Sequence, residues 1–302
     1  MSIAQAMQFA QSLGLDRLDA QLLVLHALGR TNRERAWLLA HSDDAMPATA
    51  LAQLQALATR RAAGEPLAYI TGHNEFYGLT LQVDARVLDP RADTETLVDW
   101  ALELLDASTI AAPDVVAEPT ALAAPTSATP ASAPTLIDLG TGSGAIALAI
   151  KHSRPHLQVH ALDFSNDALT VASANAHRLA LDVHFHQGCW LAGLHQQFSV
   201  IVSNPPYIAA QDAHLTALTH EPLQALASGD DGLDDIRTII DQAPAHLLPG
   251  GWLLLEHGYD QATTVRTLLQ EARFTSVQSR QDLAGIERCS GGQWPGLAHH
   301  PV

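Results

Sequence analysis

The first 63 residues carry a helical pattern of apolar positions. Leucines recur at steps of three and four residues between Leu15 and Leu28, which places them on one face of a helix. Gly29 can end that helix, and a second long helical pattern closes at Gly64. Residues 3–63 are therefore predicted to form a small helical bundle, and none of their side chains suggests chemistry.

The pattern changes after this bundle. From 65 to 88, apolar residues alternate around a Tyr77-Gly78 turn, which predicts a β-hairpin. A helix capped at Asp93 or Thr94 is expected to run to about Asp106. The following segment, 107–134, is mostly Ala, Pro, Thr and Ser, contains five prolines and has no aromatic residue. Because it cannot bury enough apolar surface to offset its ordering entropy, a disordered or extended insertion is expected.

Buried strands and helices alternate beyond the insertion. A helix is expected from Leu233 to Leu247, ending at a Pro-Gly-Gly turn, 249–251. This alternation predicts an α/β fold, a doubly wound, Rossmann-like and mostly parallel sheet. We expect a helical bundle (1–64), a β-hairpin connector (65–90) and an α/β domain (91–302). The expected strands are 135–139, 157–162, 183–186, 198–202, 252–256, 274–280 and about 285–290.

A glycine-rich loop, Gly140-Thr141-Gly142-Ser143-Gly144, joins the first of these strands to a helix. Glycines let the backbone approach a ligand closely, and the helix N-terminus offers free N–H groups. Asp163 ends the next strand, where a carboxylate can accept both hydroxyls of a ribose. The loop lacks the glycine spacing of the dinucleotide-binding fingerprint. No Lys-Ser/Thr pair ends it, so it is not a phosphate-binding P-loop. Adenosine without a pyrophosphate fits this pattern, which points to S-adenosylmethionine.

Two further residues are candidates at this ligand. Asp138 precedes the loop and could orient it or meet an amino group of the cofactor. Trp190 follows the third strand and could flank a purine ring, although a tryptophan is more often core packing. His184, His186 and Cys189 invite comparison with a metal site, but no second cluster completes one, so no metal is predicted.

A stiff turn, Asn204-Pro205-Pro206-Tyr207, follows the strand 198–202. Two prolines cannot donate to the strand ladder, so the strand must stop at the edge where α/β sheets hold ligands. The Asn204 amide and neighbouring carbonyl oxygens could hold a planar amide or amine, with the Tyr207 ring on its face. The alternative is a strand-ending turn with a packed tyrosine.

Composition narrows the class of protein. Among 302 residues, 32 are acidic and 16 basic, giving a formal net charge of −16, which disfavours nucleic acid and suits a basic protein partner. Two cysteines, Cys189 and Cys289, indicate a reducing compartment. No signal peptide or membrane-spanning run is evident, so a cytoplasmic, monomeric protein without membrane contact is expected.

Taken together, these motifs resemble the HemK/PrmC family of bacterial methyltransferases, which modify the glutamine of the Gly-Gly-Gln motif in peptide chain release factors. The likeness covers almost the whole chain outside 107–134. The segment joining Pro90-Arg91 to Thr94-Glu95 is more selective than Asn-Pro-Pro-Tyr, which also occurs in DNA adenine methyltransferases. The residues that carry the resemblance are 64–72, 75–78, Pro90-Arg91, Thr94-Glu95, 138–144, 204–208, Glu221-Pro222, 231–233 and 255–258 with Gln261.

The resemblance implies an S-adenosylmethionine-dependent glutamine-N5 methyltransferase acting on release factors 1 and 2, with no metal. The helical bundle would help to grip the release factor. The Asn204 side-chain oxygen and the Pro205 carbonyl would accept the two amide hydrogens, while Tyr207 packs on the amide plane. The implied cofactor residues are Gly140, Thr141, Gly142, Ser143, Gly144, Asp163, Trp190 and Asn204, and the implied substrate residues are Asn204, Pro205, Pro206 and Tyr207.

Several features leave alternatives open. Asp89 and Cys189 depart from the residues common in the family, and the insertion is longer than expected. Arg91 could contact a partner, but an ion pair is favoured. The competing functions are a glutamine methyltransferase of a ribosomal protein, a DNA or RNA amino-methyltransferase, and a non-enzymatic binding protein. Finally, the chain itself contains Gly291-Gly292-Gln293, for which chance is favoured over self-modification.

Overall fold

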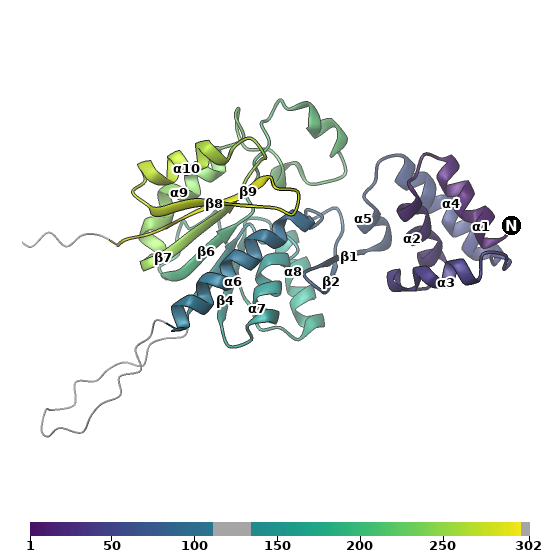
Figure 1. Ribbon diagram of the computed structural model, residues 1–302, viewed down its shortest axis with the longest axis horizontal. Helices are drawn as coiled ribbons and strands as arrows, with labels where there is room; N and C mark the ends of the chain where they lie inside the picture. Colours follow the sequence, from purple (N-terminus) through teal and green to yellow (C-terminus); the bar gives the residue numbers. More distant parts are fainter. Residues whose placement is uncertain (111–133, 297–302) are drawn as a thin grey trace, which may run out of the picture.

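The computed structural model describes residues 1–110 and 134–296. Most of the predicted insertion, residues 111–133, lies outside this part of the chain. Figure 1 shows an α/β body on one side and a group of short helices around the N-terminus on the other, with α5, β1 and β2 between them.

The N-terminal helices confirm the predicted bundle. They share one apolar core in which Leu23, Leu38 and Leu54 are fully buried. Ser2 precedes the first helix and forms a reciprocal capping box with Gln5. The helices are α1 (Ile3–Ser12), α2 (Arg17–Ala27), α3 (Arg35–Ala40) and α4 (Ala48–Ala62), with a 3-10 turn at Asn32–Glu34 before α3.

The β-hairpin of the connector is shorter than predicted. Its strands are β1 (His73–Phe76) and β2 (Leu79–Gln82), and the residues before them form a helix, α5 (Leu67–Thr71). The hairpin prediction was therefore wrong for the start of 65–88. The chain turns helical after Pro66 because a proline suits a helix start, and Gly72 ends the helix in a left-handed conformation.

A seven-stranded sheet forms the α/β body, in the order β5-β4-β3-β6-β7-β9-β8. Five neighbouring strands, from β5 to β7, run parallel, and β9 is antiparallel to both of its neighbours. This confirms the doubly wound, mostly parallel sheet. The strands are β3 (Thr135–Leu139), β4 (Gln158–Asp163), β5 (His184–Gln187), β6 (Phe198–Ser203), β7 (Leu247–Glu256), β8 (Thr275–Gln281) and β9 (Glu287–Gln293).

Helices cover both faces of this sheet (Figure 1). On one face, α6 (Glu95–Ile110), α7 (Ala145–Ser153) and α8 (Asn166–Leu179) share a core with the hairpin. On the other face, α9 (Asp234–His246) and α10 (Ala262–Glu271) share a second core. Buried strand residues alternate between the two cores, as the pleat requires.

In the α/β body, three boundaries differ from the predictions by more than two residues. Helix α6 continues to Ile110, past the predicted end near Asp106. Strand β7 begins at Leu247 and includes 249–251, which was predicted as a turn. The register between β6 and β7 shifts here, so a bulge absorbs the Pro-Gly-Gly sequence without ending the strand. Strand β9 extends to Gln293, beyond the predicted end at Ser290.

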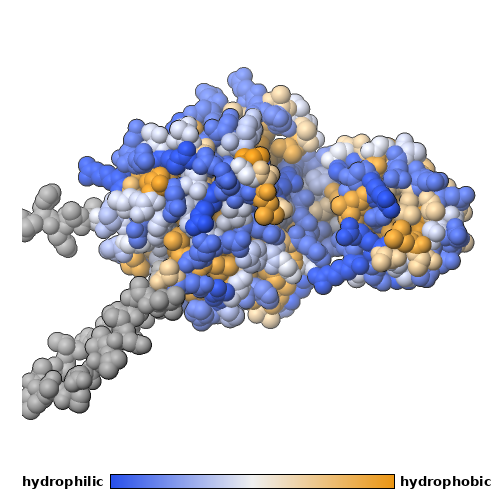
Figure 2. Space-filling view, viewed as in Figure 1, coloured by the Kyte–Doolittle hydropathy of each residue, from blue (hydrophilic) through white to orange (hydrophobic). Residues whose placement is uncertain are grey.

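The surface in view is largely hydrophilic, and its apolar residues gather in small patches rather than one broad face (Figure 2). Within residues 1–110 and 134–296, no helix has the length and apolar character needed to cross a bilayer.

Candidate active site

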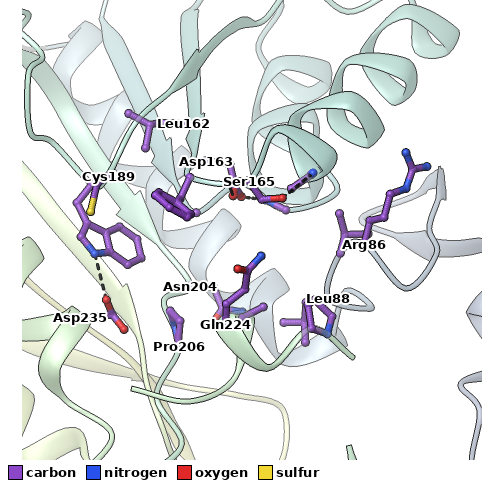
Figure 3. Close-up of a pocket in the computed structure, with 18 of the residues that line it drawn as sticks. Arg86, Leu88, Leu162, Asp163, Ser165, Cys189, Asn204, Pro206, Gln224 and Asp235 are labelled. Carbon is purple, nitrogen blue, oxygen red and sulfur yellow. Dashed lines mark hydrogen bonds between the residues drawn. The ribbon is translucent and has the colours of Figure 1, made fainter. Parts of the chain in front are cut away.

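A cavity of about 340 Å³ opens at the carboxyl ends of the parallel strands. The strand order reverses between β3 and β6, and a crevice at such a point is where open α/β sheets hold ligands. Figure 3 shows Asn204 and Pro206 across the cavity from Asp163 and Ser165, with Asp235 and Cys189 at one end and Leu88 and Arg86 at the other. Residues from four strand ends and from the connector therefore meet here.

The glycine loop and Asp163 form one wall of the cavity. Gly140 and Gly142 line it, and both have a positive φ that a side chain would strain. The Asp163 carboxylate accepts the Gly142 N–H at 2.8 Å and the Ser165 N–H at 2.9 Å, so it joins the loop to the start of α8. Burial raises the pKa of Asp163, while these backbone N–H groups lower it. Each oxygen keeps a lone pair for a hydroxyl of a ligand.

The other three residues of the loop do not line the cavity. Thr141 and Ser143 are buried, and Gly144 begins α7. A Cβ at Gly144 would lie 2.9 Å from Leu148 Cδ1, and the residue has a positive φ, so packing and backbone conformation both favour glycine here. The structure gives these three residues a role in shaping the loop, and a direct contact of each with a cofactor stays a prediction.

Asp138 holds the loop from behind. One carboxylate oxygen accepts the Thr141 hydroxyl at 2.7 Å and the Ala147 N–H at 3.2 Å. The side chain is fully buried, and its other oxygen has no hydrogen-bond partner. Burial raises the pKa of Asp138 to about 7, despite the lowering effect of the two hydrogen bonds. Of the two roles considered from the sequence, orienting the loop is the one these contacts support.

Trp190 lies on the cavity wall against the glycine loop. A Cβ at Gly140 would come within 3.4 Å of the Trp190 ring, so glycine leaves room for the indole. The indole N–H donates to Asp235 at 3.1 Å, shown as a dashed line in Figure 3. Sequence reasoning missed Asp235, because only the fold brings the start of α9 to this position. Sequence reasoning also missed Phe164, which follows Asp163 and lines the cavity. Its aromatic side chain is 69% exposed.

The Asn-Pro-Pro-Tyr turn forms the opposite wall. Asn204 and Pro206 line the large cavity, and Asn204 and Tyr207 also line a smaller cavity of about 100 Å³. Pro205 is buried. The Gln261 amide donates to the Tyr207 carbonyl at 3.0 Å, which fixes the end of the turn. The structure thus brings Asn204 and Pro206 to the cavity that Asp163 lines, whereas Tyr207 lines only the smaller cavity and Pro205 lines neither.

A buried carboxyl group lies beneath this turn. Glu256 ends β7, is 2% exposed, and has one oxygen 3.5 Å from the Tyr207 hydroxyl. Burial, with a smaller contribution from the Asp93 charge, raises the pKa of Glu256 to about 7, against the lowering effects of the Thr94 hydroxyl and Arg288. Burial also raises the pKa of Tyr207. The Glu256 motif was noted in the sequence, but no role was predicted for it.

A third cavity, of about 310 Å³, lies between the helical bundle and the α/β body. Arg91 reaches both carboxylate oxygens of Glu221 at 2.7 and 2.8 Å, which confirms the predicted ion pair. Asp89 accepts the Asn74 amide at 2.6 Å and lies 3.7 Å from Arg91. The Asp89 charge is therefore offset by a cation and a hydrogen bond, and its side chain lines this cavity instead of the one at Asn204.

The histidines of β4 and β5 lie against one another. His160 Nδ1 lies 2.9 Å from His186 Nε2, and the His160 ring is 4.9 Å from that of His184. Burial and these neighbouring rings lower the pKa of His160 to about 4. Across the described part of the chain, no group of three or more His, Cys, Asp or Glu residues is arranged to hold a metal ion.

The internal Gly-Gly-Gln sequence lies in β9, between β7 and β8. A Cβ at Gly291 would lie 2.6 Å from Leu254 Cδ2, and one at Gly292 would lie 2.8 Å from Phe274 Cβ. The Gln293 amide donates to the Gly250 carbonyl at 2.9 Å. Close packing therefore accounts for both glycines, which supports the interpretation of this tripeptide as coincidence.

The fold and this site define an S-adenosylmethionine-dependent methyltransferase. Residues 3–72 match the PrmC N-terminal domain family, and residues 120–231 match the methyltransferase small domain family. The chain is 46% identical to the release factor glutamine methyltransferase of Xylella fastidiosa (strain Temecula1), over 94% of this chain and 95% of the relative. It is 45% identical to that of Burkholderia pseudomallei, over 98% of each. The chain belongs to the release factor glutamine methyltransferase family, and it is a glutamine methyltransferase.

A likeness to a more distant solved structure concerns the fold alone. The catalytic domain of hMettl16, in complex with the MAT2A 3′UTR hairpin 6, superposes with a TM-score of 0.55 at 14% identity, covering 82% of this chain and 84% of that one. The shared architecture therefore extends well beyond the glycine loop.

Proposed function

We propose that this enzyme methylates the side-chain amide nitrogen (N5) of the glutamine in the Gly-Gly-Gln motif of peptide chain release factors 1 and 2. The printed names of its relatives, together with their near full-length alignment, support a release factor as the substrate. The observation that carries the proposal is the position of Asn204, which lines both the large cavity and the small one beside Tyr207. One residue thus borders two compartments, one for a methyl donor and one for an amide.

The acceptor side fits a primary amide. A glutamine amide nitrogen is a weak nucleophile because its lone pair is delocalised, so it needs orientation more than it needs a base. Asn204 Oδ1 and the Pro205 carbonyl would accept its two N–H bonds and aim the nitrogen at the large cavity. The same two oxygens favour the positive charge that develops on that nitrogen. Tyr207 would cover the amide plane and keep water away.

The large cavity fits S-adenosylmethionine by the chemistry of its walls. Asp163 would accept the ribose hydroxyls, Gly140 and Gly142 leave the backbone open to close approach, and Trp190 offers an aromatic face. When bound, S-adenosylmethionine supplies an electrophilic methyl group on a sulfonium. Asn204 would contact it as well, and Thr141, Ser143 and Gly144 would act by keeping the loop in shape.

The cleft between the bundle and the α/β body would receive the release factor. Its cavity shares Arg91 and Leu218 with the small cavity at Tyr207, so a protein segment held there can reach the acceptor position. Residues 1–64, 65–90 and 91–302 would then serve as grip, connector and catalytic domain. The net charge of −16 suits a basic surface on the partner.

Mass spectrometry of a purified release factor tests this proposal. The release factor is incubated with the enzyme and S-adenosylmethionine, and a variant with asparagine in place of the motif glutamine serves as the matched control. We expect one added methyl group on the motif peptide of the natural factor alone. Acid hydrolysis of that peptide should release methylamine, since the methyl is expected on the amide nitrogen.

Two outcomes would overturn the proposal. Transfer to a ribosomal protein, with none to the release factor, would reassign the substrate. Methylation of the asparagine control to the same extent would show that the motif glutamine is not the acceptor.

A further inference from the structure

The Asn204 amide is held on one side by a buried hydroxyl group. Its nitrogen, Nδ2, donates to Thr94 Oγ1 at 3.3 Å, and Thr94 is 4% exposed. Thr94 ends the 3-10 turn η2 (Ala92–Thr94), which lies 110 positions earlier in the chain. Because the nitrogen of the amide is turned toward Thr94, its oxygen is left for another donor. In Figure 3 the Asn204 side chain extends from the turn toward the cavity.

Glu256 contacts the same turn from below. Its carboxyl group lies beside the Thr94 hydroxyl and 3.5 Å from the Tyr207 hydroxyl, so it touches the support of Asn204 and also Tyr207 directly. One of its oxygens, Oε2, is buried without any hydrogen-bond partner. A buried carboxyl group with an unmet acceptor destabilises a fold. Packing alone therefore does not explain a glutamate at this position.

We propose that Thr94 and Glu256 are positioning residues for methyl transfer: Thr94 holds the Asn204 amide so that its oxygen faces the acceptor, and Glu256 fixes the Thr94 and Tyr207 hydroxyls. This inference rests on the proposed function, in which Asn204 Oδ1 accepts an N–H of the substrate. An asparagine amide can turn over and present its nitrogen instead. A donor facing the donor groups of a glutamine amide would repel it, so the orientation decides whether the site works.

The ionisation of Glu256 affects this arrangement. As a carboxylate it can accept the Thr94 O–H, which would leave the Thr94 oxygen free to accept from Asn204. As a neutral acid it can donate to that oxygen and compete with the Asn204 amide. The charged and titratable groups around it are Asp93 before α6, Arg288 and Cys289 on β9, and Tyr207 on the turn.

Thr94→Val and Thr94→Ser form a matched pair of variants. Valine keeps the shape of the buried side chain and removes the hydroxyl, whereas serine keeps the hydroxyl. With both substrates saturating, we expect Thr94→Val to lower kcat 10- to 100-fold with little change in KM for S-adenosylmethionine. Thr94→Ser should stay within a few-fold of the wild type. Equal losses in the two variants, or wild-type kcat in Thr94→Val, would overturn the proposal.

A second readout needs no substrate. The chain has five asparagines, so selective nitrogen-15 labelling gives few side-chain amide signals, and those of Asn204 are identified by their loss in Asn204→Asp. Hydrogen exchange at the Asn204 amide should accelerate in Thr94→Val and not in Thr94→Ser. The Asn175 amide is the internal control, because it is fully buried and donates to Gln82 and Ser143 at 3.0 Å. Unchanged Asn204 exchange in Thr94→Val would contradict the inference even if activity fell.

Glu256→Gln completes the test. The exchange rate of the Asn204 amide is measured against pH and corrected for its intrinsic pH dependence. In the wild type, the corrected rate should show a step near pH 7, where Glu256 ionises. This step should be absent in Glu256→Gln. A step that persists in the variant would exclude Glu256 as its source. If the wild-type enzyme leaves the release factor unmethylated, the proposed function fails, while the exchange measurements still decide whether Thr94 and Glu256 hold Asn204.

Discussion

The two walls of the active-site cavity are built in different ways. The wall with the glycine loop and Asp163 comes from one βαβ unit, and the Asp163 carboxylate joins its parts by accepting the backbone N–H groups of Gly142 and Ser165. The opposite wall is a four-residue turn whose side chains are held by Thr94 and Glu256, 110 and 49 positions away from their partners in the chain. In the proposed function, binding of the nucleoside is thus specified locally, whereas orientation of the acceptor depends on the assembled fold.

Asn204→Ala should separate the two walls most clearly. Removing the amide takes away the oxygen that we propose aims the acceptor, so we expect kcat to fall by about 100- to 1,000-fold, the usual cost of one preorganised catalytic contact. Affinity for S-adenosylmethionine, measured by calorimetry, should stay within a few-fold of the wild type. Turnover like that of the wild type would remove Asn204 from the catalytic role.

Asp163→Asn should give the converse pattern. In the variant the amide nitrogen must face the N–H of Gly142 or Ser165, and part of the charge assistance to ribose hydroxyls is lost. Hydrogen bonds to charged groups contribute about 1.5–3 kcal/mol. We therefore expect KM for S-adenosylmethionine to rise about 10- to 100-fold, with kcat at saturation within a few-fold. A fall in kcat that saturating cofactor does not restore would show that the two walls are not separable.

Glu256→Gln sharpens the comparison through stability. The folded pKa of Glu256 is raised from 4.5 to about 7, so its contribution to stability is full below about pH 4.5 and is lost as the pH rises through 7. At pH 8 the neutral glutamine should raise the free energy of unfolding by up to about 3 kcal/mol, and at pH 4.5 the difference should nearly vanish. Urea unfolding at the two pH values measures this. If Glu256→Gln is less stable than the wild type at pH 8, the fold stabilises the Glu256 carboxylate through hydrogen bonds or charges.

Asp235→Ala should have the smallest effect. The indole of Trp190 loses one hydrogen bond but keeps its packing against the glycine loop. The net contribution of such a bond is about 1 kcal/mol, so KM for S-adenosylmethionine should rise about fivefold. Asp234→Ala is the matched control, since that neighbouring carboxylate does not line the cavity and pairs with Arg237 on the surface. If both variants raise KM equally, the rise comes from a change in α9 and not from the lost hydrogen bond to the indole.

The sequence predicted what short segments specify. The glycine loop, Asp163 and the Asn-Pro-Pro-Tyr turn each carry a local signal, because backbone freedom, a strand end and two prolines dictate structure within a few residues. The hairpin start was wrong because Leu67 to Thr71 are apolar at spacings that suit either a strand or one helical turn. The Pro-Gly-Gly segment was misplaced because a bulge, visible only in the pairing of β6 with β7, keeps it in the strand.

The supporting side chains could not be predicted for a different reason. Thr94 and Glu256 were visible as parts of motifs, but their meeting under the turn depends on how α6 and β7 pack. Asp235 likewise reaches Trp190 only because α9 covers that end of the sheet. A single sequence carries no direct signal for contacts between segments so far apart.

The Gly-Gly-Gln of β9 has a practical meaning for finding substrates. Its glycines are locked into a sheet between two neighbours, and its glutamine amide is already bonded to Gly250. An identical tripeptide can therefore exist in a cell, and even in the enzyme itself, without being available for modification. With Gly-Gly-Gln as the proposed acceptor motif, a proteome search for targets by tripeptide alone will overcount. Filtering the matches by loop accessibility should separate true acceptors from sequences that a fold has sequestered.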